Sequence, residues 1–300
     1  MLTAGLALLL VSAVIHAVAQ AMIKGARDKR VYSWLMLCAA GFLGLPLLFT
    51  LDFRAVPPVG WSLILARGVL EALYYSVLSK AYELGDFSTV YPISRGSAPL
   101  FVLLWAAAFL GERPSAAGLL GILLVVVGIY FVNLPSLSAW RMPFTAAAGR
   151  SVPWALMTGV VISLYTSVDK VGIRYFQPAV YLHLVVSMAA LLLAPRFLFA
   201  SRREAVLTEL SEPKRGGGRQ LDLRACGRIV LCAILVSMAY GLVLAALRLN
   251  PASYVAPTRE ISVVVGAWIG VRFFGERGGR LRLVAACLVM AGVVVIALSK

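Results

Sequence analysis

Ionisable side chains inside long apolar segments are the residues of this chain best placed for chemistry. A charge in such a segment is costly, so it usually binds a ligand, carries a proton or pairs with another charge. Arg95 and Arg259 each lie about eight residues into an apolar segment, and Glu260 follows Arg259 directly. Arginine binds carboxylate and phosphate groups through paired N–H donors. These residues therefore predict either a site for an anionic group or a set of bridges between helices.

A second group of candidates surrounds Arg67 and Glu71. The two are four positions apart, which brings them together on one helix face. They form either a self-neutralising structural pair or part of a substrate or proton site. Glu71, Glu260 and His16 are the candidates for proton coupling. The other candidates for the substrate site are polar residues of the same segments: Tyr75, Tyr91 and Gln20.

Three further expectations follow from position alone. Neighbours on a helix point about 100° apart, so Arg259 and Glu260 are not expected to pair directly, whereas Glu260 can pair with Arg95. Asp169 and Lys170 come late in their segment and are predicted to lie at a membrane interface. His183, which has no amide or charged side chain four positions away, is predicted to be structural.

Composition places the chain in a membrane. It has 300 residues, of which 61% are hydrophobic and 14% charged, far from the balance of a soluble domain. The net charge of +15 lies largely in the polar segments between apolar runs, which the positive-inside rule explains without nucleic acid. No metal, nucleotide or nucleophile motif is present, so we predict no enzyme activity, no cofactor and no metal.

The apolar runs predict an all-α integral membrane protein with ten transmembrane helices. They lie near 2–23, 31–51, 61–82, 87–110, 116–134, 153–172, 178–199, 225–246, 252–274 and 282–299. Residues 81–132 resemble residues 245–296 at a constant shift of 164 positions, which superposes Arg95 on Arg259 and Gly111-Glu112-Arg113 on Gly275-Glu276-Arg277.

The chain is therefore divided into two five-helix repeats, 1–134 and 153–300, joined by a linker at 135–152. An odd number of spans per repeat makes the repeats inverted, around a central cavity at the bilayer midplane. The segment 200–224, which contains Gly216-Gly217-Gly218, is predicted to be a flexible loop with one amphipathic turn.

Several stretches resemble the EamA-type transporters of the drug/metabolite transporter superfamily. They are HAVAQAMIKGARDK at 16–29, YELGDFSTVYPISRGSAPLF at 82–101, LGERPSAAGLLGILLVVVGIY at 110–130, YTSVDKVGIR at 165–174 and FGER at 274–277. The resemblance implies two inverted five-helix repeats that work by alternating access. It also implies cytoplasmic termini, whereas Lys and Arg are more numerous in the loops after odd-numbered helices, which would put the termini outside.

The main hypothesis is a multi-pass secondary active transporter of the cell inner membrane. It exports a small polar metabolite, such as an amino acid or an organic anion, with protons as the candidate coupling ion. Its partners are the substrate and the lipid bilayer, without nucleic acid, and it is a monomer or a homodimer. The alternatives are an exporter of lipophilic compounds, in which the arginines only brace helices, and a non-transporting membrane assembly component.

Overall fold

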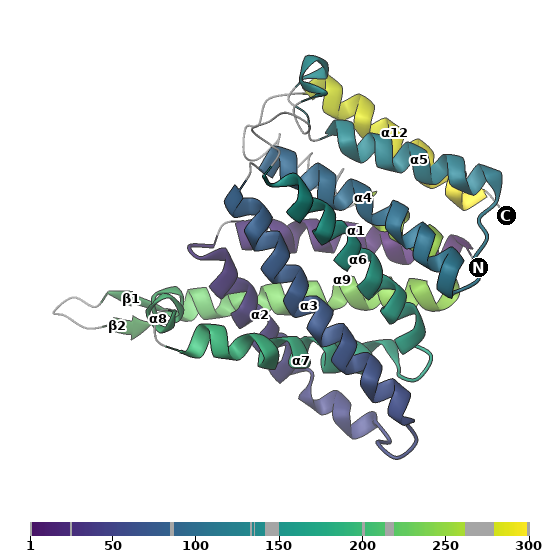
Figure 1. The fold of residues 1–300 in the computed structure, drawn as a ribbon. Coiled ribbons are helices and arrows are strands. Elements are labelled where there is room, and N and C mark those ends of the chain that lie inside the picture. Colours follow the sequence, from purple (N-terminus) through teal and green to yellow (C-terminus); the bar gives the residue numbers. More distant parts are fainter. Residues whose placement is uncertain are drawn as a thin grey trace.

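The computed structural model describes residues 2–24, 26–84, 87–132, 134, 136–141, 150–199, 202–213, 219–261 and 279–298, and these are almost entirely helical (Figure 1). The long helices are α1 (Leu2–Lys24), α2 (Lys29–Leu43), α3 (Pro58–Leu84), α4 (Phe87–Phe109), α5 (Ala116–Val132), α6 (Val152–Gly172), α7 (Pro178–Leu198), α9 (Leu223–Leu249) and α12 (Gly279–Leu298). The short elements are η1 (Leu45–Thr50), η2 (Leu137–Ala139), α8 (Arg203–Leu210), β1 (Ser211–Pro213), β2 (Arg219–Leu221) and α10 (Ala252–Arg259).

Residues with strong local preferences mark the ends of several helices. Pro58 and Pro178 open α3 and α7, at first-turn positions where the missing N–H leaves no intrahelical bond unmade. The Asp28 carboxylate accepts hydrogen bonds from the N–H groups of Arg30 and Val31 and so caps α2. Local sequence therefore determines where these helices begin.

The described helices agree in position with the ten predicted segments, with two differences. The segment 31–51 is α-helical only to Leu43 and continues as the 3₁₀ helix η1, because Gly44 ends α2 and Pro46 has no N–H to continue it. The segment 252–274 begins as α10, which ends at Arg259. Its residues from 262 onward lie outside the described part of the chain.

Four of the described helices are long and apolar enough to cross a membrane: Pro58–Leu78, Val152–Gly172, Pro178–Leu198 and Leu223–Leu249. Shorter apolar helices cover Ala4–Ala19, Ile93–Phe109, Ala116–Phe131 and Val284–Ile296. Large apolar side chains such as Leu191 and Phe109 point outward, as expected where lipid is the solvent. The protein thus has several membrane-crossing helices, and the number ten stays a prediction.

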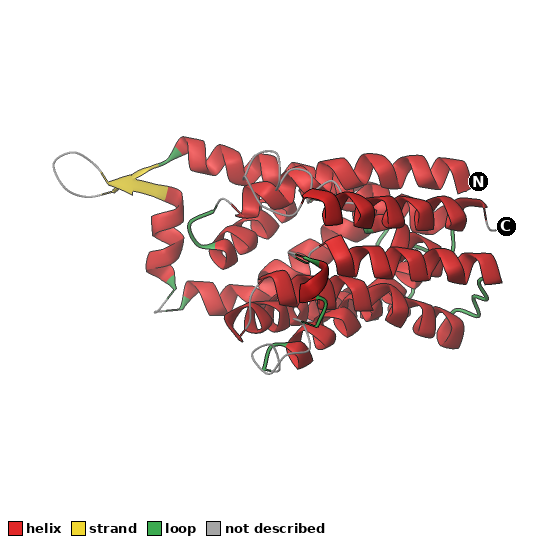
Figure 2. Ribbon diagram, turned by 90° about the horizontal axis from the view of Figure 1, so that it is seen from above, coloured by secondary structure: helices red, strands yellow, loops and turns green. Residues whose placement is uncertain are grey.

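The segment after α7 is more ordered than the predicted flexible loop. It contains α8 and an antiparallel pair of strands, in which Ser211 lies opposite Leu221 and Pro213 opposite Arg219. The glycine run at 216–218 lies outside the described residues. This hairpin projects from one end of the bundle, and both chain termini lie at the other end (Figures 1 and 2). We call these the hairpin end and the termini end.

The two halves of the chain are interleaved rather than side by side. The most extensive helix packings join the halves: α1 on α9, α3 on α6, α4 on α6, α2 on α7 and α5 on α12. By order in the two repeats, α1 corresponds to α6, α2 to α7, α3 to α9 and α5 to α12. When corresponding helices are exchanged, the packing of α1 on α9 becomes that of α6 on α3. The packings of α2 on α7 and of α5 on α12 remain the same pairs. This symmetry of contacts is what an internal repeat produces in three dimensions.

Glycines allow the backbones of α5 and α12 to come close. A Cβ placed on Gly292 would lie 2.6 Å from the carbonyl oxygen of Gly121 and 2.8 Å from the amide nitrogen of Val125. In lipid there is no hydrophobic driving force between helices, so helices associate through close van der Waals packing, which small residues at the crossing allow. We expect Gly292→Val to lower the free energy of unfolding by about 1–3 kcal/mol, as overpacking does.

Thermal unfolding in detergent measures this effect. Gly227→Ala in α9 is the matched control, because a Cβ at Gly227 meets no atom within 4 Å. That substitution should leave stability unchanged or raise it by up to about 1 kcal/mol, since alanine is the better helix former. Equal unfolding temperatures for the two variants would contradict the proposed close packing.

Candidate functional site

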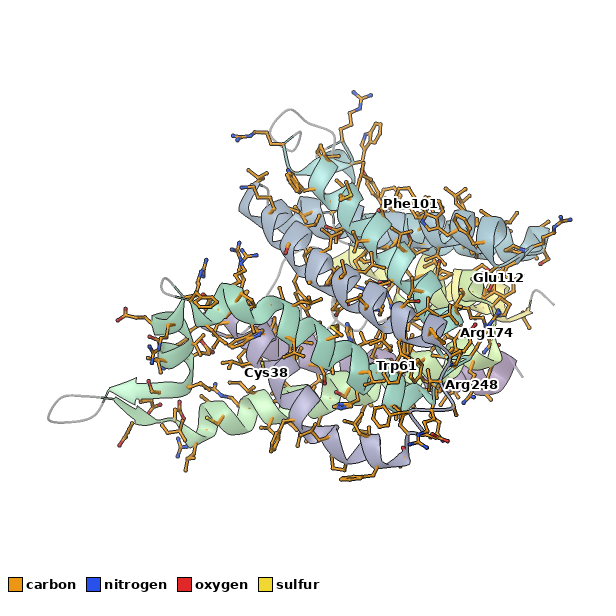
Figure 3. The ribbon with its side chains drawn as sticks, turned by 60° about the horizontal axis from the view of Figure 1, so that its bottom comes forward. Cys38, Trp61, Phe101, Glu112, Arg174 and Arg248 are labelled. Atoms are coloured by element: carbon orange, nitrogen blue, oxygen red, sulfur yellow. The ribbon has the colours of Figure 1, made fainter. Side chains whose placement is uncertain are left out.

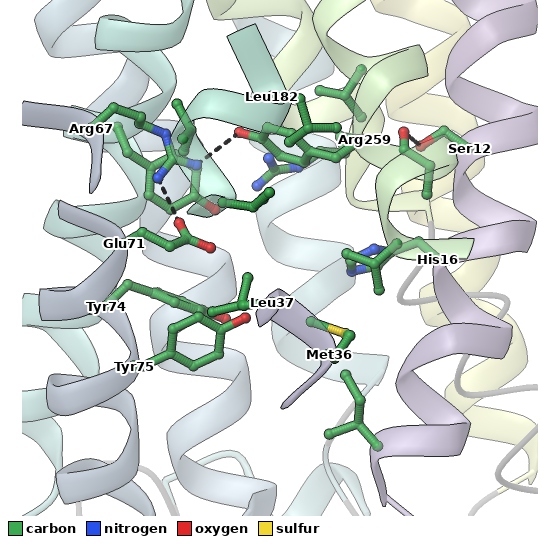
Figure 4. A pocket seen from close by; sticks show the side chains of 18 of the residues that line it. Ser12, His16, Met36, Leu37, Arg67, Glu71, Tyr74, Tyr75, Leu182 and Arg259 are labelled. Atoms are coloured by element: carbon green, nitrogen blue, oxygen red, sulfur yellow. Dashed lines mark hydrogen bonds and ion pairs between the residues drawn. The ribbon is translucent and has the colours of Figure 1, made fainter. Parts of the chain in front are cut away.

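A cavity of about 100 Å³ lies in the middle of the bundle, with room for several water molecules. Helices of both halves line it, from α1 to α10 (Figure 4). Its polar lining consists of Ser12, His16, Arg67, Glu71, Tyr74, Tyr75, Arg95, Tyr165, Tyr240 and Arg259. Its apolar lining includes Met36, Leu37, Leu182, Val186, Val236 and Val243.

Most of the site residues predicted from sequence meet here. Arg95, Arg259, Arg67, Glu71, Tyr75 and His16 all line the cavity, and Glu260 lies buried against two of the arginines. The side chains of Gln20 and Tyr91 are outside the described part of the structure. Residues that are far apart in the sequence thus converge as the repeat predicts.

Arg95, Arg259 and Glu260 form a group that we call the cationic trio. The same Glu260 oxygen, Oε1, lies 3.5 Å from an Arg95 nitrogen and 3.4 Å from an Arg259 nitrogen. Two positive charges share one negative charge, so the trio carries a formal charge of +1 when all three groups are ionised. Both distances exceed the usual 2.7–3.2 Å of an N–H···O bond, so neither arginine is tightly held by this carboxylate.

The contact between Arg259 and Glu260 corrects the expectation that these neighbours would not pair. Helix α10 ends at Arg259, and Glu260 has φ −70° and ψ −1°, a conformation that turns the chain. The 100° offset between the two Cβ atoms still applies, but the long, flexible arginine side chain reaches across it to the Glu260 carboxylate. Glu260 is 1% exposed, and its second oxygen, Oε2, has no hydrogen-bond partner among the described residues.

Arg67, Glu71 and Asp169 form a second group, the anionic trio. The Arg67 guanidinium lies 2.5 Å from Glu71, as the four-residue spacing predicts, and 2.7 Å from Asp169 on α6. One positive charge faces two negative charges, so the trio carries a formal charge of −1 when ionised. Glu71 lines the cavity, whereas Asp169 is fully buried behind it.

Asp169 is fully buried among protein groups, while its place at the membrane interface stays a prediction. Its carboxylate accepts hydrogen bonds from the hydroxyl groups of Tyr181, at 3.0 Å, and of Tyr240, as well as from Arg67. The Arg67 guanidinium also lies over the Tyr165 ring, 4.1 Å from its centroid. These contacts join α3, α6, α7 and α9, so Arg67 is largely occupied by internal partners.

Lys170 and His183 lie outside the cavity lining. The Lys170 amine donates hydrogen bonds to the carbonyl groups of Leu247 and, at 2.7 Å, Asn250, at the C-terminal end of α9. Its place at the membrane interface stays a prediction. His183 packs under the α2–η1 turn, where a Cβ on Gly44 would lie 2.2 Å from its Nδ1 atom. That placement accords with a structural role.

Sequence reasoning missed Asp169, Tyr165 and Tyr240 as residues of this region. A usable signal for Asp169 was its acidic side chain in an otherwise apolar helix, four positions after Tyr165. The rings of Tyr74 and Tyr165 lie edge to face with centroids 6.1 Å apart, and Tyr74 contacts Tyr75 in the same way at 5.2 Å. These rings make one wall of the cavity aromatic.

Aromatic packing fills the bundle beside the anionic trio. The Trp61 ring stacks on Phe53 with centroids 5.8 Å apart and meets the edge of Phe176 at 5.6 Å. Phe176 in turn contacts Tyr181, whose hydroxyl reaches Asp169. No group of three or more His, Cys, Asp or Glu side chains in the described part of the chain could hold a metal ion.

Comparison with known proteins agrees with this architecture. The model of the EamA-like transporter family matches the chain twice, over residues 3–134 and 149–298. The chain belongs to the EamA-like transporter family. The two matched ranges correspond to the two repeats that the sequence predicts, and the resemblance noted from individual motifs is thereby confirmed.

A solved structure described as "Crystal structure of protein" has the same fold as this EamA-like transporter. It superposes with a TM-score of 0.73, covering 99% of this chain and 96% of the other, at 16% sequence identity. Comparison with curated proteins finds no match. Family membership makes the protein a multi-pass membrane transporter of the drug/metabolite transporter superfamily, with a small molecule as substrate.

Proposed function

We propose that this protein is a secondary active exporter of a small polar metabolite that carries a carboxylate or similar anionic group. The observation that carries the proposal is the cationic trio, in which two arginines at the cavity share a single carboxylate at 3.4–3.5 Å. Both guanidinium groups line the cavity, and a guanidinium binds an oxyanion through paired hydrogen bonds. The substrate anion binds between Arg95 and Arg259, and a simple cation is repelled there.

The anionic trio supports a zwitterion as the preferred substrate. Glu71 faces the cavity from α3, and Figure 4 shows His16 facing it from α1. An ammonium group at Glu71 and a carboxylate at the cationic trio would satisfy both charged groups, while the tyrosine wall packs against an apolar side chain. Glu71, Glu260 and His16 stay the candidates for proton coupling, because each is an ionisable group at or beside the cavity.

Counterflow in proteoliposomes tests this function. We expect labelled L-phenylalanine, a zwitterion, and labelled succinate, an anion, to be better substrates than labelled agmatine, a cation. Glu71→Gln should then reduce L-phenylalanine counterflow about tenfold and leave succinate unaffected, since only the ammonium group loses its partner. Preferential agmatine counterflow would contradict the proposal. Size-exclusion chromatography of Glu71→Gln ensures that the comparison is made on folded protein.

An exporter of lipophilic compounds is the second candidate. It is favoured by the apolar lining from α2, α7 and α9, and by the fact that both arginines already contact Glu260. In that case the arginines brace α4 and α10, and glutamine in place of either would leave transport intact. Labelled tetraphenylphosphonium, a lipophilic cation, distinguishes the two candidates in the same counterflow assay.

A further inference from the structure

Glu112 belongs to the Gly111-Glu112-Arg113 segment after α4 in the first repeat, which we call the hinge. Its side chain contacts α10 in the second repeat. Its Oε1 atom accepts a hydrogen bond from the Ala252 N–H at 2.8 Å. Its Oε2 atom accepts from the Ser253 N–H at 2.9 Å and from the Ser253 hydroxyl at 2.7 Å. The carboxylate therefore satisfies two of the N–H groups that the first turn of α10 leaves without intrahelical partners.

Helix α10 depends on this distant residue because its own sequence supplies no cap. The residue at the N-cap position is Pro251, and no side-chain hydrogen bond caps the helix from there. By contrast, α2 and α9 are capped by their own aspartates, Asp28 and Asp222. A carboxylate at a helix N-terminus also interacts favourably with the helix dipole.

The backbone of the hinge directs the Glu112 side chain toward the first turn of α10. Gly111 has φ +67°, in the left-handed region that glycine adopts without strain, and it follows the end of α4. The Glu112 N–H turns back to the Ala106 carbonyl oxygen at 3.1 Å, which anchors the hinge to the last turn of α4. The backbone of one repeat thus orients the carboxylate toward the other.

Other contacts hold the same junction together at the termini end. The Tyr254 hydroxyl accepts a hydrogen bond from the Ser115 N–H at 3.2 Å, and Lys170 donates to the Asn250 carbonyl at 2.7 Å. In the view of Figure 3, Glu112, Arg174 and Arg248 are labelled on the same side of the bundle. Most of α10 is buried among its neighbours, so its position is determined by protein contacts rather than by lipid.

We propose that Glu112 is a positioning residue of this transporter, which sets the place of α10 and, through it, of Arg259 and Glu260. Arg259 lies seven residues after Ala252, roughly 10 Å along the same helix, so a shift of the first turn also displaces the end of the helix at the cavity. The claim about the cavity rests on the proposed function. The claim that Glu112 holds α10 does not.

Hydrogen–deuterium exchange with mass spectrometry tests the structural part without a substrate. In the full-length protein, Glu112→Ala should speed the exchange of peptides covering residues 251–259 by about tenfold or more, the factor expected for losing charge-assisted hydrogen bonds. Glu112→Gln, which keeps one acceptor, should have a smaller effect. The matched control is Arg113→Ala, since Arg113 is the exposed neighbour in the same hinge. Unchanged exchange in Glu112→Ala would overturn the inference.

Counterflow of L-phenylalanine tests the functional part. Glu112→Ala should raise KM several-fold more than it lowers the maximal rate, with Arg113→Ala unchanged. In an Arg259→Ala background it should add little further loss, because both changes act on the same contact. Faster exchange with normal KM would overturn the positioning role. If the wild-type protein carries none of the tested compounds, the proposed function fails, and exchange in α10 still decides whether Glu112 holds this helix.

Discussion

Arg95→Ala is expected to abolish transport of anionic and zwitterionic substrates while the protein still folds and reaches the membrane. Arg95 contributes one of the two cations of the cationic trio, and removing it leaves Arg259 beside Glu260. The cationic trio then has no formal positive charge left for a substrate. Truncating one partner of a buried charge pair costs about 2–5 kcal/mol, which corresponds to at least a 30-fold loss of apparent affinity. Counterflow of L-phenylalanine and succinate in proteoliposomes measures it.

Two further substitutions make the Arg95 prediction specific. Arg95→Lys keeps the charge but loses the planar pair of donors, so transport should be intermediate. Arg54→Ala removes an exposed arginine outside the helices and should leave transport unchanged. Normal transport by both Arg95→Ala and Arg95→Gln would show that the arginines brace helices, as in an exporter of lipophilic compounds.

Arg67→Ala is expected to be the most destabilising single substitution in the bundle. It would leave the carboxylates of Glu71 and Asp169 close together, with exposed side-chain fractions of 16% and 0%, and without their shared cation. Removing one partner from a buried ion pair typically costs about 3–5 kcal/mol, because the remaining charge stays buried. Thermal unfolding of the purified protein in detergent measures the loss.

The order of the stability losses of three variants distinguishes this explanation from a general sensitivity of the site to substitution. Asp169→Asn leaves Arg67 paired with Glu71 and should cost less, about 1–3 kcal/mol, for the weakened hydrogen bonds to Arg67 and the two tyrosines. Glu71→Gln, at the cavity surface, should cost least. A more stable Arg67→Ala than Asp169→Asn would contradict the assignment of Arg67 as the shared cation.

We expect the anionic trio to contribute mainly to stability and the cationic trio mainly to substrate binding. Arg67 is occupied by Asp169, Glu71 and aromatic rings, and its contacts tie α3, α6 and α9 together. Arg95 and Arg259 contact Glu260 at 3.5 Å and 3.4 Å, which are longer distances than those of the Arg67 ion pairs. We therefore expect substitutions at Arg67 to appear first as lost stability, and those at Arg95 as lost transport.

Features that depend on near neighbours in the chain could be predicted from the sequence. The apolar runs located the helices, because a membrane-crossing helix must satisfy its own backbone and be apolar over about 20 residues. The spacing of Arg67 and Glu71 predicted their contact, because a helix places residues four apart on one face. The duplicated segment predicted the two repeats to which the family model matches.

Features that join distant segments required the tertiary structure. The partnership of Arg67 with Asp169, the cap that Glu112 provides for α10 and the contacts of Lys170 each link different helices or loops. No periodicity relates such residues, since their approach depends on how whole helices pack. Even the contact between the adjacent residues Arg259 and Glu260 depends on the side-chain conformations that packing selects, and not on their spacing along the helix.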